Sequence, residues 1–448
     1  MLKKSLVIII SALIISSFAA CTGNAGQSSS SSSSASSVTS GSSVSADSSS
    51  SGNSSSSGSE EVTFSGYEKG IIDTTNIFTK RDLTQTADTS SAKTLEVSDG
   101  QTLKITEEGV YVIKGTAKNC TIRVEADDTA KVQLVLDGVS ITNDSTPAIY
   151  VVSADKCFVT TSADSSLSVT GAFTADGDTN TDAVIFSKDD LVLNGTAALT
   201  INSAQGNGVT GKDDVKVTGG TYNITSALDS IEANDSIAIY DGTLTINSSK
   251  DGLHSENSDD DTKGYVYIHG GTFTINAKSD AVQATTYLQV DGGTFKLTAA
   301  EGFEGTSIQI NDGTIEISAS DDGINGTQKS KSIGTPNIEI NGGKLTIVMG
   351  QGDTDAIDCN GNITVNGGTI DITAQMSSFD YDGTATYNGG TIIINGQEVN
   401  SIPQSMMGGG GMGGQMGGGM GGGMGGGMGG QAPNAQNGNG FGGNGFAR

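Results

Sequence analysis

The chain has 448 residues, of which 65 are glycine and none is tryptophan. Aspartate and glutamate number 50 against 23 lysines and arginines, so the net charge at pH 7 is −27. Because phosphate groups need a basic surface, this balance argues against nucleic acid or anionic lipid as a direct partner. An acidic surface, by contrast, is suited to gathering divalent cations.

Residues 1–20 are typical of a bacterial lipoprotein signal peptide. The stretch "MLKK" supplies a positive end, and "SLVIIISALIISSFAA" supplies a short apolar segment that ends in small residues. The sequence "FAAC" resembles a lipobox in which Cys21 is lipidated, although Phe18 stands where such boxes usually carry leucine. The alternative is an ordinary signal peptide with an incidental cysteine. We expect a lipid anchor at Cys21 and a location on the extracellular face of the bacterial cell membrane.

Two segments of low complexity flank the region that can form a core. Residues 21–61 are nearly all serine, glycine, alanine and threonine, and we expect a flexible linker there. Residues 403–448 are rich in glycine and methionine, and we expect a disordered tail. The folded part therefore lies between them, with 62–104 as an N-terminal cap region and 105–402 as the main domain.

The main domain repeats one short pattern. "GGTYNITSALDSIEA" (219–233), "GGTFTINAKSDAVQA" (270–284) and "GGTFKLTAAEGFEG" (292–305) each hold a glycine pair, an alternating strand and an acidic turn. The second glycine recurs from 220 to 390 at a mean spacing of about 24 residues. That period is within the range for solenoids and is too short for a propeller blade of roughly 40–50 residues.

Each repeat contains three strand-like pieces: one before the glycine pair, one after it and one after the acidic turn. We therefore expect an all-β fold, a right-handed parallel β-helix with about 20–30 residues per coil. The expected inward side chains come in alternating pairs, such as Phe273/Ile275 after the glycines and Val266/Ile268 before them. The second glycine should allow the φ > 0 corner, and the extra length should lie in loops at 255–264 and 325–336.

The acidic turns predict a column of carboxylates. Stacked coils would place the leading acids about 4.8 Å apart, and such carboxylates repel by about 1 kcal/mol even in bulk water. Raised pKa values or bound cations can relieve this cost, and Ca²⁺, which takes six to eight oxygen ligands, is the natural candidate. The alternative is that Asp-Gly and Asp-Ala are ordinary turn residues. The candidate calcium ligands are Asp229, Glu232, Asp251, Asp280, Glu301, Glu304, Asp322, Asp353, Asp355, Asp358, Asp380 and Asp382.

Four stretches resemble a known family. "KVQLVLDGVSI", "IFSKDDLVLNG", "GQGDTDAIDCNGNITVNGGTI" and "FDYDGTATYNGG" are similar to the bacterial carbohydrate-binding β-helix lipoproteins first described from a cellulose-degrading clostridium. The resemblance covers about residues 78–400. It implies a right-handed parallel β-helix similar to pectate lyases, bound calcium, and binding of cellulose and acidic pectic polysaccharide. No sugar-contact residue of the family is matched to a position here.

Exposed aromatic side chains are the candidates for stacking on sugar rings. The alternative is that a tyrosine on a solvent-facing strand only reflects the high β-strand propensity of tyrosine. With only three arginines in the chain, we expect calcium to bridge protein carboxylates and uronate carboxylates. We expect a monomer that binds plant cell-wall polysaccharide without catalysis. The candidate carbohydrate-binding residues are Tyr265, Tyr267, Tyr287, Phe379 and Tyr381.

Two other functions fit the same pattern. The first is a calcium-dependent polysaccharide lyase, in which Lys250 or Lys278 would remove the proton next to a uronate carboxylate. The alternative for both lysines is a solvated turn position that softens acidic repulsion. His254 is a candidate ligand or base, and the preferred interpretation is a surface residue. The second function is a structural stalk or adhesin, which predicts calcium-dependent stability without affinity for saccharide.

Overall fold

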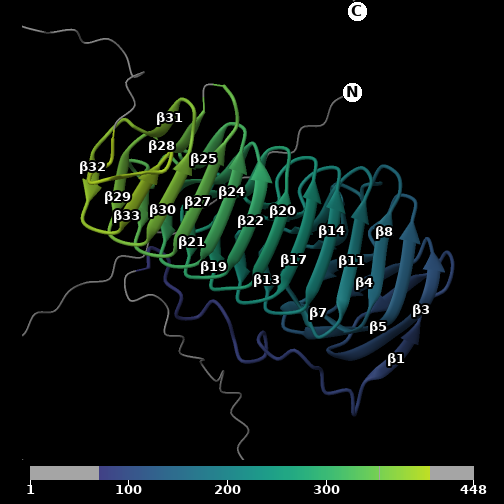
Figure 1. Ribbon diagram of the computed structural model, residues 1–448. Helices are drawn as coiled ribbons and strands as arrows, with labels where there is room; N and C mark the ends of the chain where they lie inside the picture. The colour runs from purple at the N-terminus through teal and green to yellow at the C-terminus, as the bar shows by residue number, and fades with distance from the viewer. Residues whose placement is uncertain (1–69, 353, 404–448) are drawn as a thin grey trace, which may run out of the picture. The chain divides into compact units, whose positions relative to one another are not determined.

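A computed structural model describes residues 70–352 and 354–403. This part of the chain contains 34 β-strands and no helix, and hence no helix long and apolar enough to cross a membrane. The segments expected to be a signal peptide and a linker, including Cys21, lie outside the described residues, as do Asp353 and residues 404–448 of the expected tail. The strands stack coil upon coil as a parallel β-helix (Figure 1), which confirms the predicted fold class.

Three columns of parallel strands, here called faces 1, 2 and 3, form the walls of the β-helix. Face 1 holds the strand that precedes the glycine pair in each coil. The long strands β3 and β5 continue from face 1 into face 2, and β21 and β23 reach face 1 from face 3. Face 1 contains β1 (Lys93–Glu96), β3 (Gly109–Lys118), β5 (Lys131–Asn143), β7 (Lys156–Ala163), β10 (Asp190–Gly195), β13 (Asp214–Val217), β16 (Ser236–Ile239), β19 (Tyr265–Ile268), β21 (Asp280–Val290), β23 (Glu301–Ile310), β26 (Asn337–Ile340), β29 (Asn362–Val365) and β32 (Ala385–Tyr387).

Face 2 holds the strand that follows the glycine pair. It ends in an antiparallel pairing of β33 with β34, which closes the last coil. Besides the ends of β3 and β5, face 2 contains β8 (Ser165–Val169), β11 (Ala198–Ser203), β14 (Thr221–Ser226), β17 (Thr243–Ser248), β20 (Thr272–Asn276), β22 (Thr294–Ala299), β24 (Thr314–Ala319), β27 (Lys344–Met349), β30 (Thr369–Thr373), β33 (Thr391–Ile394) and β34 (Gln397–Val399).

Face 3 holds the strand that follows the acidic turn, so this face carries the candidate cation ligands. It begins in the first coil and ends close to the C-terminal end of the described chain. Besides the starts of β21 and β23, face 3 contains β2 (Thr102–Ile105), β4 (Thr121–Glu125), β6 (Ile149–Ser153), β9 (Ala183–Ser187), β12 (Asn207–Gly211), β15 (Ile231–Ala233), β18 (Leu253–Ser255), β25 (Asp322–Gly326), β28 (Asp355–Cys359) and β31 (Ser377–Tyr381).

The core is a set of stacks of like side chains that run along the β-helix. The inward pairs predicted from the sequence are buried, including Phe273/Ile275 on face 2 and Val266/Ile268 on face 1. In-register pairing places Phe273 against Phe295, whose rings stack at 4.5 Å between centroids. A single coil cannot bury these side chains by itself, so the stacking of neighbours supplies the hydrophobic stabilisation.

Residues 70–92 form an N-terminal strap that runs lengthwise along face 1 (Figure 1). It begins beside β21 and β23, where the backbone amides of Ile72 and Ile71 hydrogen-bond to Gln289 and Gln309. It reaches β10 and β13, where Gln85 bonds to the backbone of Gly195 and Thr218. Within the cap region predicted at 62–104, the described residues form the strap, which covers face 1, and then β1 and most of β2.

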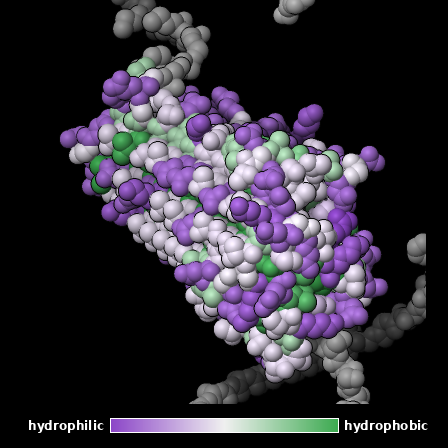
Figure 2. Space-filling model, turned by 90° about the vertical axis from the view of Figure 1, so that its right-hand side faces the viewer, coloured by the Kyte–Doolittle hydropathy of each residue, from purple (hydrophilic) through white to green (hydrophobic). Residues whose placement is uncertain are grey.

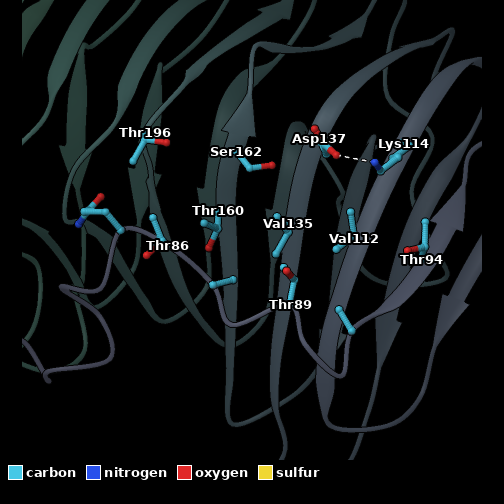
Figure 3. A pocket seen from close by; sticks show the side chains of 13 residues that line it. Thr86, Thr89, Thr94, Val112, Lys114, Val135, Asp137, Thr160, Ser162 and Thr196 are labelled. Atoms are coloured by element: carbon cyan, nitrogen blue, oxygen red, sulfur yellow. Dashed lines mark ion pairs between the residues drawn. The ribbon is translucent and has the colours of Figure 1, made fainter.

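A polar hollow of about 480 Å³ lies between the strap and the first strands of face 1 (Figure 3). Strap residues such as Thr86 and Thr89 line one side, and Thr160 of β7 lines the other. The ion pair between Lys114 and Asp137, at 2.7 Å, spans neighbouring strands within it. The hollow is the space between the strap and the strands of face 1. It therefore lies on a different face from the acidic column.

The second glycine of each pair turns the corner between faces 1 and 2. At Gly271 the backbone has φ 117°, and a Cβ there would lie 3.0 Å from the carbonyl oxygen of Gly242 in the preceding coil. The same corner recurs at Gly293 with φ 108°. The predicted φ > 0 corner is confirmed, and it couples the turn to the close approach of adjacent coils.

Substituting Gly271→Ala should lower the free energy of unfolding by about 1–3 kcal/mol, because only glycine adopts this backbone conformation without strain. The matched control is Gly270→Ala, where φ is ordinary and the nearest atom to a new Cβ is 3.4 Å away. Denaturant unfolding of both variants measures the difference. Equal stability of the two variants would contradict the steric account of the corner.

Candidate functional site

Parallel in-register stacking on face 3 produces two adjacent ladders of polar side chains. The first ladder consists of the leading acids of the turns, in which Asp280 pairs with Glu301 and Asp322 pairs with Asp355. The second ladder lies three residues further on. It runs Glu232, His254, Gln283, Glu304, Asn325, Asp358 and Asp380.

The first ladder has a structural task within the fold. One carboxylate oxygen of Asp229 accepts the backbone N–H of Asp251 at 3.0 Å, and Asp251 does the same for the N–H of Asp280. Asp322 accepts the N–H of Asp355 at 3.2 Å. Each of these acids thus joins its coil to the next with one oxygen, which leaves the second oxygen for other partners.

Asp229, Asp251 and His254 form the first of two compact groups. Lys250 Nζ lies 2.8 Å from Asp229 Oδ2, and His254 Nδ1 lies 3.4 Å from the same oxygen. Burial alone would raise the pKa of Asp229, but the hydrogen bonds from His254 and Lys250 lower it to about 2. Burial would lower the pKa of His254, and its contacts with Asp229 outweigh that effect and raise it. This group therefore contains its own counter-charges.

The acidic trio, Asp280, Glu301 and Glu304, forms the second group. One carboxylate oxygen from each lies within 4.8 Å of the others. Burial, and then the charges of Glu304 and Asp251, raise the pKa of Asp280 to about 9. Burial, and then Glu304, raise the pKa of Glu301 to about 8. A divalent cation at the trio would compensate the negative charges of these buried carboxylates, and three carboxylates form a donor set that fits calcium.

Two amides and the ammonium group of Lys329 contact the trio. Gln283 Nε2 donates to Asp280 at 2.9 Å and also to Glu304. Asn325 Nδ2 donates to Glu301 at 3.1 Å, while its buried Oδ1 has no hydrogen-bond partner among the described residues. An amide oxygen of this kind is a further oxygen donor of the type that calcium accepts.

A third acidic region follows towards the C-terminal end of the ladders. Burial, and then Asp358, raise the pKa of Asp322 to about 7. Burial, and then Asp355 and Asp380, raise the pKa of Asp358 to about 6. Within the described ranges, neither lysine nor arginine forms an ion pair with Asp322 or Asp358. Asp382, on the same side, is exposed.

Comparisons with known proteins show which proteins this chain is similar to. A sequence model of the carbohydrate-binding domain-containing protein family matches residues 99–356 and 307–407. This chain belongs to that family. A carbohydrate-binding domain-containing protein from Acetivibrio thermocellus is 34% identical over 134 residues, which is 29% of this chain and 46% of that relative. The chain therefore matches about half the length of this relative.

A solved structure is also similar, that of a polysaccharide lyase-like protein from C. thermocellum in a gadolinium derivative. It is 22% identical, and the match covers 68% of this chain and 97% of that chain with a TM-score of 0.29. The description of the family supports the binding of carbohydrate in general.

The predicted sugar-contact aromatics are only partly on the surface. Tyr267 is 1% exposed because strap residue Phe78 packs on it, and its hydroxyl donates to Asp291 at 2.9 Å. Phe379 is fully buried, because alternation along β31 points it into the core next to Ile357. The prediction that these two side chains face a ligand is wrong.

The other predicted aromatics are half-buried. Tyr265 packs beside the strap, Tyr287 lies on β21, and Tyr381 packs against the core close to the C-terminal acids. The interpretation of His254 as a surface residue was also wrong, since it is 6% exposed. His254 follows an apolar residue directly, as Glu232 does, and the two pair in register. This repeat position is the signal that could have placed His254 in the second ladder. Figure 2 shows hydrophilic side chains spread over one view of the molecule, with small hydrophobic areas between them.

The raised carboxyl pKa values predict how stability depends on pH. In the unfolded chain these carboxyls titrate near pH 4, so between about pH 4 and 9 the folded state holds more protons. Stability from Asp280, Glu301 and Asp322 is fully present below about pH 4 and is lost progressively until the pH has risen through the folded pKa values of about 7 to 9. In chelator, the melting temperature should fall by at least about 5 °C between pH 5 and 9.

Saturating calcium should abolish most of that fall, since the cation replaces the protons. Thermal unfolding across the pH range, with chelator and with calcium, measures both curves. A chelated protein whose melting temperature rises between pH 5 and 9 would contradict the burial and repulsion deduced for these three carboxyls.

Proposed function

We propose that this protein is a non-catalytic, calcium-dependent binder of plant cell-wall polysaccharide, held by a lipid on Cys21 at the extracellular face of the bacterial membrane. Cellulose and polygalacturonate are the candidate ligands. The observation that carries the proposal is the acidic trio, in which three carboxylates converge within reach of one cation. Calcium bound there would have coordination positions that the trio leaves open, and the carboxylates of an acidic polysaccharide would fill them.

The contacts of the described arginines favour recognition of a ligand carboxylate through calcium over its direct recognition by arginine. Arg81 lies over the ring of Phe158 at 4.5 Å, and Arg123 pairs with Asp176 at 3.0 Å. Both of the described arginines are therefore engaged within the fold. A bidentate arginine fork, the usual partner of a carboxylate, is not offered by them to a ligand on face 3.

The lysines next to the acids favour binding over elimination. A lyase base must be neutral when it removes a proton. Burial would lower the pKa of Lys250, but its hydrogen bond with Asp229 raises it above the ordinary value. The same holds for Lys329, through Glu304. Both amines are therefore protonated at neutral pH, which disfavours Lys250 as the base of a lyase. Lys278, the other candidate base, is an exposed side chain.

Retention on insoluble polymer tests the proposal. The protein is incubated with cellulose and with polygalacturonate attached covalently to agarose beads, in calcium and in chelator, and the supernatant is assayed for unsaturated uronates. We expect retention that chelator abolishes and no unsaturated product. Product would favour the lyase, and absence of retention on both polymers would leave the structural stalk.

Substitution of the trio locates the effect. The double variant Glu301→Gln/Glu304→Gln keeps size and removes two charges, and it should weaken retention on polygalacturonate by about tenfold or more, as loss of ligand charge weakens calcium sites. Glu316→Gln, an exposed acid on β24, is the control and should bind as the unmodified protein does. Equal retention of the double variant and the control would place the binding surface elsewhere.

A further inference from the structure

Two loops that lengthen their coils meet beside the acidic trio. One joins β18 to β19 and the other joins β25 to β26, so both leave the same corner between faces 3 and 1. The two intervening coils have no loop there, because β21 and β23 cross the corner as continuous strands. The loops touch across this gap, where Ser330 Oγ donates to Asp261 at 2.9 Å.

The second loop is fixed to the coil beneath it. The backbone N–H groups of Lys329 and Ser330 donate to Thr306 Oγ1 at 3.0 and 2.9 Å. These hydrogen bonds fix the backbone position from which the Lys329 side chain extends. Since long insertions in a regular repeat are often functional, the meeting of two of them at one site directs attention to what they enclose.

They enclose a small polar pocket of about 150 Å³, lined by His254, Glu256, Ser258, Gln283, Thr285 and Lys329. Its donors are an imidazole, an amide, two hydroxyls and an ammonium, and its one carboxylate, that of Glu256, is 68% exposed to solvent and lies 3.7 Å from His254 Nε2. Such groups match the hydroxyl and carboxylate oxygens of a sugar acid. Gln283 belongs to both places, because it lines the pocket and bonds to the trio through Asp280 and Glu304.

Lys329 is placed between the trio and the pocket. Its Nζ lies 2.8 Å from Glu304 Oε2, and its side chain keeps 35% of its surface exposed while that of Glu304 keeps 6%. The ammonium therefore reaches the trio from the solvent side. One ammonium faces three carboxylates here, whereas the group at Asp229 has both Lys250 and His254.

A divalent cation at the trio would compete with this ammonium for the oxygens of Glu304. Like charges at such separations repel, so the two cannot share the carboxylate favourably. We propose, on the basis of the function proposed above, that Lys329 is a sugar-binding residue that a bound divalent cation releases from Glu304 into the adjoining pocket, where its ammonium binds the carboxylate of an acidic sugar. The cation site and the sugar pocket are thereby coupled through one side chain.

The proposal gives Lys329 opposite effects on two ligands, which a merely structural lysine would not have. Removing the ammonium in Lys329→Met should tighten calcium binding in the absence of sugar by about tenfold, a coupling of ordinary size. In saturating calcium the same variant should bind a galacturonic acid oligomer about tenfold more weakly. Titration calorimetry with calcium alone and then with the oligomer measures both constants.

Lys331→Met is the matched control, since Lys331 is an exposed lysine two residues away in the same loop. It should leave both constants unchanged, and Lys329→Gln should reproduce Lys329→Met. Matching far-UV circular dichroism spectra of all variants check that the fold is intact, because loss of the ion pair with Glu304 is itself expected to lower the melting temperature of the Lys329 variants in chelator.

Each other outcome has a definite meaning. Unchanged or weaker calcium binding by both Lys329 variants would overturn the proposal. Unchanged binding of the oligomer by these variants, when the unmodified protein binds it, would overturn the proposal as well. If the unmodified protein in calcium binds neither the oligomer nor the polymers, the proposed function fails as well.

Discussion

In-register stacking of parallel coils is the constraint on which the rest of the structure depends. Each side chain lies directly over its equivalent in the next coil, so whatever the repeat places at one position becomes a column. For phenylalanine and isoleucine the column is a continuous apolar core that no single coil could form. For aspartate and glutamate the same geometry concentrates negative charge, and the fold must then compensate for that charge.

Face 3 compensates in two different ways. Around Asp229 the chain supplies the counter-charges itself, through Lys250 and His254, and the pKa of that carboxyl is lowered to about 2. Around Asp280 and Glu301 the internal charges are insufficient, and burial and mutual repulsion raise their pKa values to about 9 and 8. The difference between these groups, a few coils apart in one ladder, is what marks the acidic trio as the place for an external cation.

The repeat made much of this predictable. A period of about 24 residues, alternation of apolar residues and paired glycines were enough to predict the coil, the inward side chains and the φ > 0 corner at positions such as Gly271. Contacts between distant segments were not predictable, because no local pattern encodes them. The alternation of its strand predicts that Tyr267 is exposed, but the strap covers it. The position of Lys329 depends on the contact between two loops.

The central claim is that a cation occupies the trio formed by Asp280, Glu301 and Glu304. Crystals grown in calcium, with anomalous diffraction recorded to locate the ion, test it most directly. The account predicts a calcium peak with oxygens of these carboxylates at about 2.3–2.6 Å. A calcium-saturated crystal without a peak at the trio, in which Lys329 still pairs with Glu304, would contradict it.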